Sequence, residues 1–139
     1  TFALLSFLVA VSLAINWKNY YSLYFDWKKQ KDLIGFMSQS EAVKSANLVV
    51  FEDLSSNALN RSYRFYEWNG LIKVALSDDE RKFGINLSEY ENYKAGGVDK
   101  FFTEHYVAKN HKRDSEQPVV LVTLEGTRYK NTFSLKTLK

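Results

Sequence analysis

Residues 1–17 read TFALLSFLVAVSLAINW, a stretch without a single charged side chain. Within it, the run from Phe2 to Ile15 is apolar apart from Ser6 and Ser12. A helix that crosses the hydrocarbon core of a bilayer needs about 20 predominantly apolar residues, and this run is shorter than that by several. Since the chain also begins with Thr rather than Met, we expect part of a transmembrane helix whose remaining turns lie upstream of Thr1.

Aromatic and basic side chains follow the apolar run at once. Trp and Tyr are enriched at bilayer interfaces because their rings combine an apolar body with a polar edge. We therefore expect five side chains at the membrane interface: Trp17, Tyr20, Tyr21, Tyr24 and Trp27. Four lysines accompany them: Lys18, Lys28, Lys29 and Lys31. These lysines favour the cytoplasmic side, but the positive-inside rule is counted over all loops, so one flank does not decide the side.

Three other interpretations of the apolar run stay open. A secretory signal peptide would have Leu4–Leu13 as its apolar region and Ser12-Leu-Ala14 as its cleavage site, although no basic segment precedes it. A pilin-like subunit also begins with an apolar helix, but such chains usually carry Glu at the fifth position, where this chain has Leu5. A core helix of a soluble protein is the third, because apolar runs of about 10 to 14 residues are commonly of that kind.

The composition is that of a folded chain with one domain. The 139 residues are 45% apolar and 25% charged, with 6 Gly and 1 Pro, which excludes disorder and low-complexity repeats. The absence of Cys excludes disulfides, thiolate metal sites and a cysteine nucleophile. The net charge of +3 comes without a dedicated basic block, so we expect no nucleic-acid partner.

Hydrophobic periodicity after the apolar run alternates between helix and strand. Apolar residues recur near a 3.6-residue period over 17–37, which predicts an amphipathic helix. Ser38 and Glu41 have the spacing of a capping box that would begin a short second helix, and Ser88 and Glu91 repeat this spacing. The remaining predicted elements are, in order, a buried strand at 47–51, a central core helix at about 63–75, a short strand at 81–87, a helix at 98–105, and a hairpin of strands 119–125 and 129–135.

Together these elements predict an α/β (α+β) fold. An N-terminal transmembrane and amphipathic helix is followed by a small domain with a few strands, two or three helices and a C-terminal hairpin. We expect three parts: a partial transmembrane helix at 1–17, juxtamembrane amphipathic helices at 18–46, and a small α/β domain at 47–139.

Three residues of the small domain are candidates for binding a ligand. Asp53 ends the first predicted strand, and ligands of α/β folds bind at the carboxyl ends of strands. Arg64 and Trp68 bound the segment Arg64-Phe-Tyr-Glu-Trp68, which mixes charge and aromatic rings as sites that stack a sugar or a base do. The simpler alternatives are a polar strand exit for Asp53 and core packing for the aromatic residues, with Arg64 and Glu67 facing solvent.

Catalytic and metal-ligating patterns are not recognisable in the sequence. His105 and His111 are the only histidines, and neither has a second ligand at helical spacing. The acidic run at 78–80 lacks the alternating ligands and the glycine of a calcium loop, and no Gly-rich loop follows Asp53. We therefore assign no catalytic residue and expect neither a metal nor a cofactor.

The order of features resembles the C-terminal end of large bacterial polytopic membrane proteins of unassigned function. The matching segments are Trp27-Lys-Lys-Gln30, Leu48-Val-Val-Phe-Glu-Asp53 and Tyr63-Arg-Phe-Tyr-Glu-Trp-Asn-Gly70. The chain is also similar to membrane glycosyltransferases that use lipid-linked sugars and carry a soluble C-terminal domain. The likeness covers most of the chain and implies a last spanning helix that leads into a small α/β domain, with the catalytic residues upstream.

From these features we expect a non-catalytic juxtamembrane accessory or interaction domain of a larger integral membrane protein. It would be located in the cell membrane, with the lipid bilayer and upstream transmembrane helices as partners; no residue identifies a protein partner. A second hypothesis makes the domain part of a membrane glycosyltransferase, in which Asp53 and the aromatic residues around Trp68 contact a polar acceptor. A third is a secreted binding module released by cleavage after Ala14.

Overall fold

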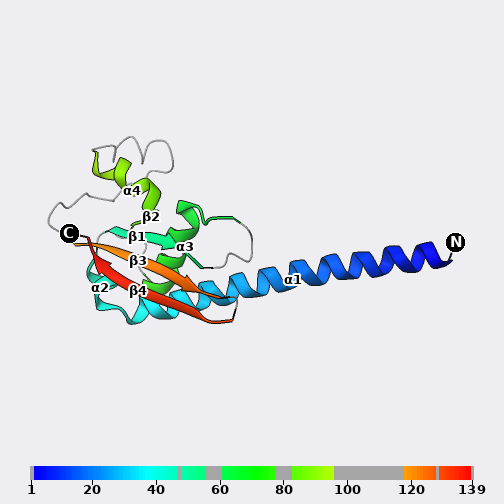
Figure 1. The fold of residues 1–139 in the computed structure, drawn as a ribbon. Coiled ribbons are helices and arrows are strands. Elements are labelled where there is room, and N and C mark those ends of the chain that lie inside the picture. Colours follow the sequence, from blue (N-terminus) through cyan, green and yellow to red (C-terminus); the bar gives the residue numbers. More distant parts are fainter. Residues whose placement is uncertain are drawn as a thin grey trace.

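The fold is a mixed four-stranded sheet with helices on both faces. The N-terminal helix packs on the sheet with its C-terminal half, and its N-terminal half projects away from the sheet (Figure 1). The computed structural model describes residues 2–46, 48–55, 61–77, 83–95, 118–127 and 129–138. The elements are α1 (Phe2–Gln39), α2 (Glu41–Ser45), β1 (Leu48–Asp53), α3 (Phe65–Leu76), β2 (Phe83–Asn86), α4 (Leu87–Lys94), β3 (Val119–Gly126) and β4 (Asn131–Thr137). The predicted α+β fold is therefore confirmed. The predicted helix at 98–105, both histidines and the acidic run at 78–80 lie outside the described residues.

The sheet has the strand order β2-β1-β3-β4. β1 pairs in parallel with β2 and with β3, so that Val50 lies opposite Ile85 on one side and Leu121 on the other. β4 pairs antiparallel with β3, which confirms the predicted C-terminal hairpin. Helix α3 connects β1 with β2, and this crossover connection is what allows the two strands to run parallel.

Alternation along the strands sends side chains into two cores. On one face, residues of β1 and β3 pack with residues of α1 and α3; this core includes Val49, Phe51, Val122, Leu33, Met37, Trp68 and Ile72. On the other face, the intervening strand residues pack with α4; this core includes Leu48, Val50, Ile85, Leu121, Tyr90 and Tyr93. The parallel strands are thus apolar on both faces, which explains why β1 reads as a continuous apolar run.

Helix α3 crosses very close to β2 at Gly84. A Cβ built there would lie 2.7 Å from Ile72 Cδ1 and 3.1 Å from Trp68 Cβ, so the glycine is needed for the close approach. The side-chain amide of Asn69 bonds the same residue twice, since Gly84 N donates to Oδ1 (3.1 Å) and Nδ2 donates to Gly84 O (3.0 Å). Asn69 therefore takes the place of a neighbouring strand along the outer edge of β2.

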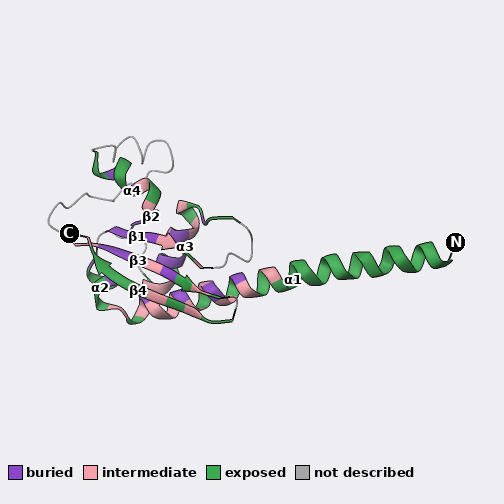
Figure 2. Ribbon diagram, viewed as in Figure 1, coloured by how far each residue is buried: buried purple, intermediate pink, exposed green. Residues whose placement is uncertain are grey.

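Helix α1 divides into an exposed half and a half that belongs to the domain (Figure 2). Every side chain from Phe2 to Tyr21 is exposed. The buried residues begin at Asp26 and continue along one stripe with Lys29, Leu33 and Met37. At 1.5 Å per residue, 38 residues give a helix about 57 Å long. It is long and apolar enough to cross a membrane.

Two helix starts differ from the predicted ones. Ser38 lies inside α1, where its hydroxyl donates to Gly35 O, and Ser40 is the residue that caps α2 by accepting from Val43 N. The N-cap of α4 is Asn86, whose backbone N–H donates to the Glu89 carboxylate (2.9 Å), and Ser88 is already within the helix. In both cases the predicted cap, Ser38 or Ser88, lies two residues from the observed cap, Ser40 or Asn86, and has the same capping-box spacing to a Glu.

The helix predicted at about 63–75 contributes one of its faces to the core. In α3, only Trp68, Leu71 and Ile72 are buried, while Tyr66 and Val74 face solvent. The helix covers one face of the sheet and contacts α1 and β2. Its apolar residues on the outer face, Tyr66 and Val74, therefore lie at the surface of the domain and not in its core.

Candidate functional site

The strand order reverses the direction of the connections at the carboxyl end of β1. The chain leaves β1 through α3 to reach β2 on one side, and returns later to β3 on the other side of β1. Such a reversal separates the connections at the carboxyl ends of the parallel strands, where open α/β sheets bind their ligands. Asp53, a sequence candidate, is the last residue of β1 and lies at this edge.

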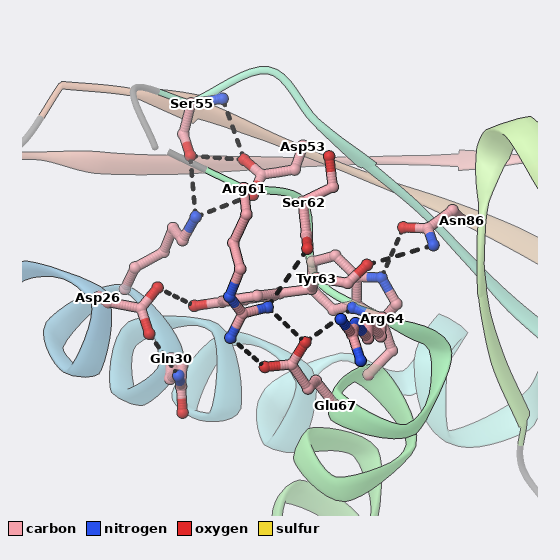
Figure 3. Close-up of polar contacts among 12 residues, drawn as sticks. Asp26, Gln30, Asp53, Ser55, Arg61, Ser62, Tyr63, Arg64, Glu67 and Asn86 are labelled. Atoms are coloured by element: carbon pink, nitrogen blue, oxygen red, sulfur yellow. Dashed lines mark hydrogen bonds and ion pairs between the residues drawn. The ribbon is translucent and has the colours of Figure 1, made fainter. Parts of the chain in front are cut away.

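An ion pair joins this edge to α1 (Figure 3). Lys29 Nζ lies 2.8 Å from Asp53 Oδ2, and the two side chains are only 5% and 7% exposed. The other carboxylate oxygen, Oδ1, accepts bonds from the hydroxyl (2.5 Å) and the backbone N–H (3.1 Å) of Ser55. Oδ2 of Asp53 thus holds α1 against the end of β1, and Oδ1 fixes the start of the loop that follows the strand.

A second buried contact lies one turn earlier on α1 (Figure 3). The hydroxyl of Tyr63 donates to Asp26 Oδ1 (2.5 Å), and Gln30 Nε2 donates to Asp26 Oδ2 (2.7 Å). The ammonium of Lys29 lies 4.7 Å from the centre of the Tyr63 ring, which links the two contacts. Burial raises the pKa of Tyr63 well above its ordinary value near 10, and the hydrogen bond to Asp26 raises it further.

This raised pKa predicts a loss of stability at alkaline pH. In the unfolded chain, Tyr63 ionises near pH 10, whereas the folded chain keeps it neutral, so its contribution is complete below pH 10 and falls as pH rises above it. We expect the free energy of unfolding of the full chain in detergent to fall by up to about 1.4 kcal/mol per pH unit above pH 10. Tyr63→Phe should flatten this slope, while Tyr66→Phe, at an exposed position, should retain it. Identical slopes for the two variants would contradict the assignment.

Beside these contacts lies an open cavity of about 490 Å³, lined by Ser62, Tyr63, Arg64, Phe65, Tyr66, Asn86 and Glu89. Its residues come from the segment before α3, the first turn of α3, and the junction of β2 with α4. Arg64 is exposed, and its guanidinium donates to the hydroxyl of Tyr66 (3.3 Å). Phe65 and Tyr66 meet edge to face, with ring centres 6.0 Å apart. The cavity thus combines a cation, a carboxylate and aromatic rings.

The charged side chains of the cavity and of the neighbouring start of α3 balance one another. Arg61 forms a two-pronged contact with Glu67, with both N–O distances 2.7 Å. The hydrogen bond from Arg61 lowers the pKa of Glu67, and the bond from Arg64 N lowers it further against the effect of burial. Glu89 accepts from both nitrogens of Asn86, so each of the two helix starts, of α3 and α4, already holds a carboxylate. An anionic ligand would therefore meet carboxylates at both helix N-termini.

Trp68 lies below the cavity and not in its wall. The side chain is fully buried, its ring stacks on Phe51 with centres 4.3 Å apart, and Tyr63 meets it edge to face at 4.7 Å. Its Nε1 donates to Asn86 Oδ1 (2.8 Å), which fixes the amide that lines the cavity. Trp68 thus supports the cavity from inside the core.

The structure separates the three sequence candidates. Arg64 lines the cavity, Asp53 pairs with Lys29 beside it, and Trp68 packs in the core. Sequence reasoning missed the roles of Asp26, Lys29 and Tyr63 and the cavity residues Tyr66, Asn86 and Glu89. The five predicted interface residues, Trp17, Tyr20, Tyr21, Tyr24 and Trp27, are all exposed on α1.

Within the described part of the chain, no group of three His, Cys, Asp or Glu residues could hold a metal ion. The polar groups of the cavity can bind a ligand through hydrogen bonds and ring stacking. No protein-family model, curated protein or solved structure matches this chain.

Proposed function

We propose that this chain is a membrane-anchored juxtamembrane domain that serves as an accessory or interaction part of a larger integral membrane protein. The observation that carries the proposal is the division of α1 into an exposed apolar half and a half that is part of the domain core. One continuous helix thus connects an apolar segment to the edge of the sheet where the cavity lies.

The exposed half of α1 has the surface of a membrane segment. Large apolar side chains point outward around the whole helix, among them Leu4, Leu5, Phe7, Leu8, Leu13 and Ile15, each more than half exposed. A contiguous apolar surface of this extent is unfavourable in water and favourable in hydrocarbon. Within the described residues no part of the domain covers this half. A bilayer is the environment that fits it.

The aromatic residues that follow lie on one face of α1 over the next three turns and are called here the aromatic collar: Trp17, Tyr20, Tyr21, Tyr24 and Trp27. Their rings contact one another along the helix, for example Trp17 with Tyr21 at 5.1 Å and Tyr24 with Trp27 at 6.1 Å. Such rings anchor spanning helices at the headgroup level. The collar thus supports a boundary between hydrocarbon and water where the domain part of α1 begins.

The rigid attachment of the domain supports an accessory role. Buried contacts of Asp26, Lys29, Leu33 and Met37 tie α1 to the sheet and to α3. A tilt or rotation of the spanning helix would therefore move the cavity with it. This is the behaviour expected of a part that reports or follows the movements of a membrane protein at its surface.

Extraction of membranes from cells that express the full chain tests the anchor. We expect the chain to resist alkaline carbonate, and Leu8→Arg to shift most of it to the soluble fraction, because Arg at the centre of a spanning helix costs about 3 kcal/mol relative to Leu. Val74→Arg is the matched control, since Val74 is an equally exposed apolar residue on α3. Full release of the unchanged chain, or equal behaviour of both variants, would refute the proposal.

A second candidate function is favoured by the cavity: part of a membrane glycosyltransferase that contacts a polar, uncharged acceptor. Aromatic rings beside Arg64, Glu89 and Ser62 offer stacking and hydrogen bonds to a hydroxyl-rich ligand, and the carboxylates at the helix starts disfavour an anion. In this version of the hypothesis, Arg64 and Tyr66 replace Asp53 and Trp68 as the contacting residues.

Binding of N-acetylglucosamine and glucose to the full chain in nanodiscs, measured by saturation-transfer NMR, tests this second candidate. We expect Tyr66→Ala to weaken binding at least about tenfold, in line with the loss of one stacking ring. Glu91→Gln, an exposed change on α4 away from the cavity lining, should have no effect. Absence of saturable binding, or equal affinity for Tyr66→Ala, would exclude the candidate.

A further inference from the structure

We infer that the turn between β3 and β4 is a second membrane contact, which rests on the anionic headgroups of the bilayer that α1 enters. The inference depends on the proposed anchor and goes beyond it, because it fixes the orientation of the domain at the surface. It concerns Tyr129 and Lys130 at the tip of the hairpin, together with the side chains of α1 that they approach.

The hairpin runs along α1 toward its exposed half. Phe133 packs on Phe36, with ring centres 5.1 Å apart, and Asn131 Nδ2 donates to Asp32 Oδ2 (2.7 Å) one turn earlier on the helix. Tyr129 then meets Phe25 edge to face at 5.6 Å. Each step toward the turn is thus a step toward the N-terminus of α1, as Figure 1 shows for the β3–β4 end of the sheet.

A hydrogen bond from α1 holds the tip of the turn. Lys28 Nζ donates to Tyr129 O (2.9 Å), and Thr127 N donates to Lys130 O (3.0 Å), which closes the turn. From this point toward the N-terminus, Phe2 to Tyr21 are exposed throughout. The turn therefore lies beside the aromatic collar.

The distance from the collar places the turn within reach of headgroups. The helix rises about 12 Å between Trp17 and Phe25 at 1.5 Å per residue. The headgroup layer of each leaflet is about 5–8 Å thick, and an average tilt of about 20° brings one side of the domain closer to it. With the hydrocarbon boundary near Trp17, the Tyr129 side chain can then enter the headgroup layer.

The exposed groups at the turn suit an anionic interface. Tyr129 is 77% exposed, although its ring edge already contacts Phe25. The turn has the sequence Gly126-Thr-Arg-Tyr-Lys130, in which Arg128 lies outside the described residues. The neighbouring acidic group on α1, Asp32, is bonded to Asn131 and lies 4.0 Å from Lys28.

Further cations near the turn outweigh the exposed acid on the hairpin. Lys28 and Lys31 lie on adjacent turns of α1, with the ammonium of Lys31 5.3 Å from the ring centre of Trp27. On the hairpin itself, Glu125 is the exposed acid in the described part. Basic residues near a membrane each contribute about 1 kcal/mol of attraction to anionic lipid, so the balance favours contact.

A bilayer fits this surface better than a protein partner. The turn continues the aromatic collar directly through the Tyr129–Phe25 contact, so lipid that surrounds the collar necessarily approaches the turn. An aromatic ring next to cations, here Tyr129 next to Lys28 and Lys130, is the composition of interfacial anchors. The turn is also too small to bury the roughly 800 Å² that each partner of a stable protein complex contributes.

Single-cysteine spin labelling of the full chain tests the inference cleanly, because the native chain has no Cys. Labels at Thr127→Cys, Leu8→Cys and Val74→Cys report the turn, the spanning half of α1, and the far end of α3. The chain is reconstituted in phosphatidylcholine vesicles with and without phosphatidylglycerol. Collision with a water-soluble nickel complex and with oxygen gives the depth of each label.

We expect the Thr127 label to be protected from nickel several-fold relative to Val74, with more protection when phosphatidylglycerol is present. Tyr129→Ala with Lys130→Glu should abolish this protection while the Leu8 label stays in the hydrocarbon. A water-exposed Leu8 label would refute the anchor itself. Two outcomes with the Leu8 label in the hydrocarbon would overturn the inference about the turn and leave the anchor intact. One is a Thr127 label as accessible to nickel as the Val74 label, and the other is protection of Thr127 that does not depend on phosphatidylglycerol.

Discussion

Lys29→Met is expected to lower the free energy of unfolding of the full chain by about 3–5 kcal/mol, because it leaves the Asp53 carboxylate buried without its cation. The pair is nearly inaccessible, and among the described residues Asp53 then retains the two bonds from Ser55. Urea unfolding in detergent, followed by tryptophan fluorescence, measures the change. The loss also detaches the helix from the end of β1, so the effect combines electrostatics with packing.

Two further variants separate these causes. Lys28→Met changes the neighbouring lysine, whose side chain is 35% exposed, and should cost no more than about 1 kcal/mol. Lys29→Met combined with Asp53→Leu removes both charges and should recover much of the stability, since apolar replacements of buried ion pairs are often close to neutral. If Lys29→Met behaved like Lys28→Met, the pair would not be buried in solution.

This ion pair also marks the limit of what the sequence could predict. Asp26, Lys28, Lys29 and Asp32 occupy polar positions of an amphipathic pattern, and nothing local distinguishes the two buried ones. The partners come from far along the chain: Asp53 lies 24 residues from Lys29, and Tyr63 lies 37 residues from Asp26. The burial of a charge is decided by such distant partners, so periodicity alone could not reveal it.

The strands and the hairpin were predictable because their signals are local. Leu48-Val-Val-Phe51 is a run of β-branched and aromatic residues, and β1 forms there. Pro118 comes directly before the strand predicted at 119–125, and β3 occupies Val119–Gly126. The sheet order was not predicted, since pairing of β1 with both β2 and β3 depends on the crossover through α3.

The candidate site was predicted in part for the same reason. Asp53 could be placed at a strand end from the apolar run before it, and Arg64 could be placed at the start of a helix. The cavity requires Asn86, which ends β2, and Glu89, which lies in α4, and tertiary packing places both on the same cavity as Arg64. The aromatic pattern around Trp68 fits both a stacking site and a core, and only burial distinguishes the two.

Trp68→Ala is expected to cost about 3–5 kcal/mol of stability, because it removes one of the largest fully buried side chains and leaves a cavity. The ring loses its stack on Phe51 and its edge contact with Tyr63, and Asn86 Oδ1 loses its donor. Denaturant unfolding of the full chain measures the loss. Trp27→Ala, at an exposed position on α1, is the control and should change stability little.

Trp68→Phe shows which part of this loss comes from packing. Phe retains an aromatic ring against Phe51 but has no N–H for Asn86, so we expect an intermediate cost of about 1–3 kcal/mol. If Trp68 contacted a ligand directly, Trp68→Phe would weaken binding at unchanged stability. In the arrangement described here, binding in the cavity changes only through the position of Asn86, because the indole itself lies on the core side of that amide.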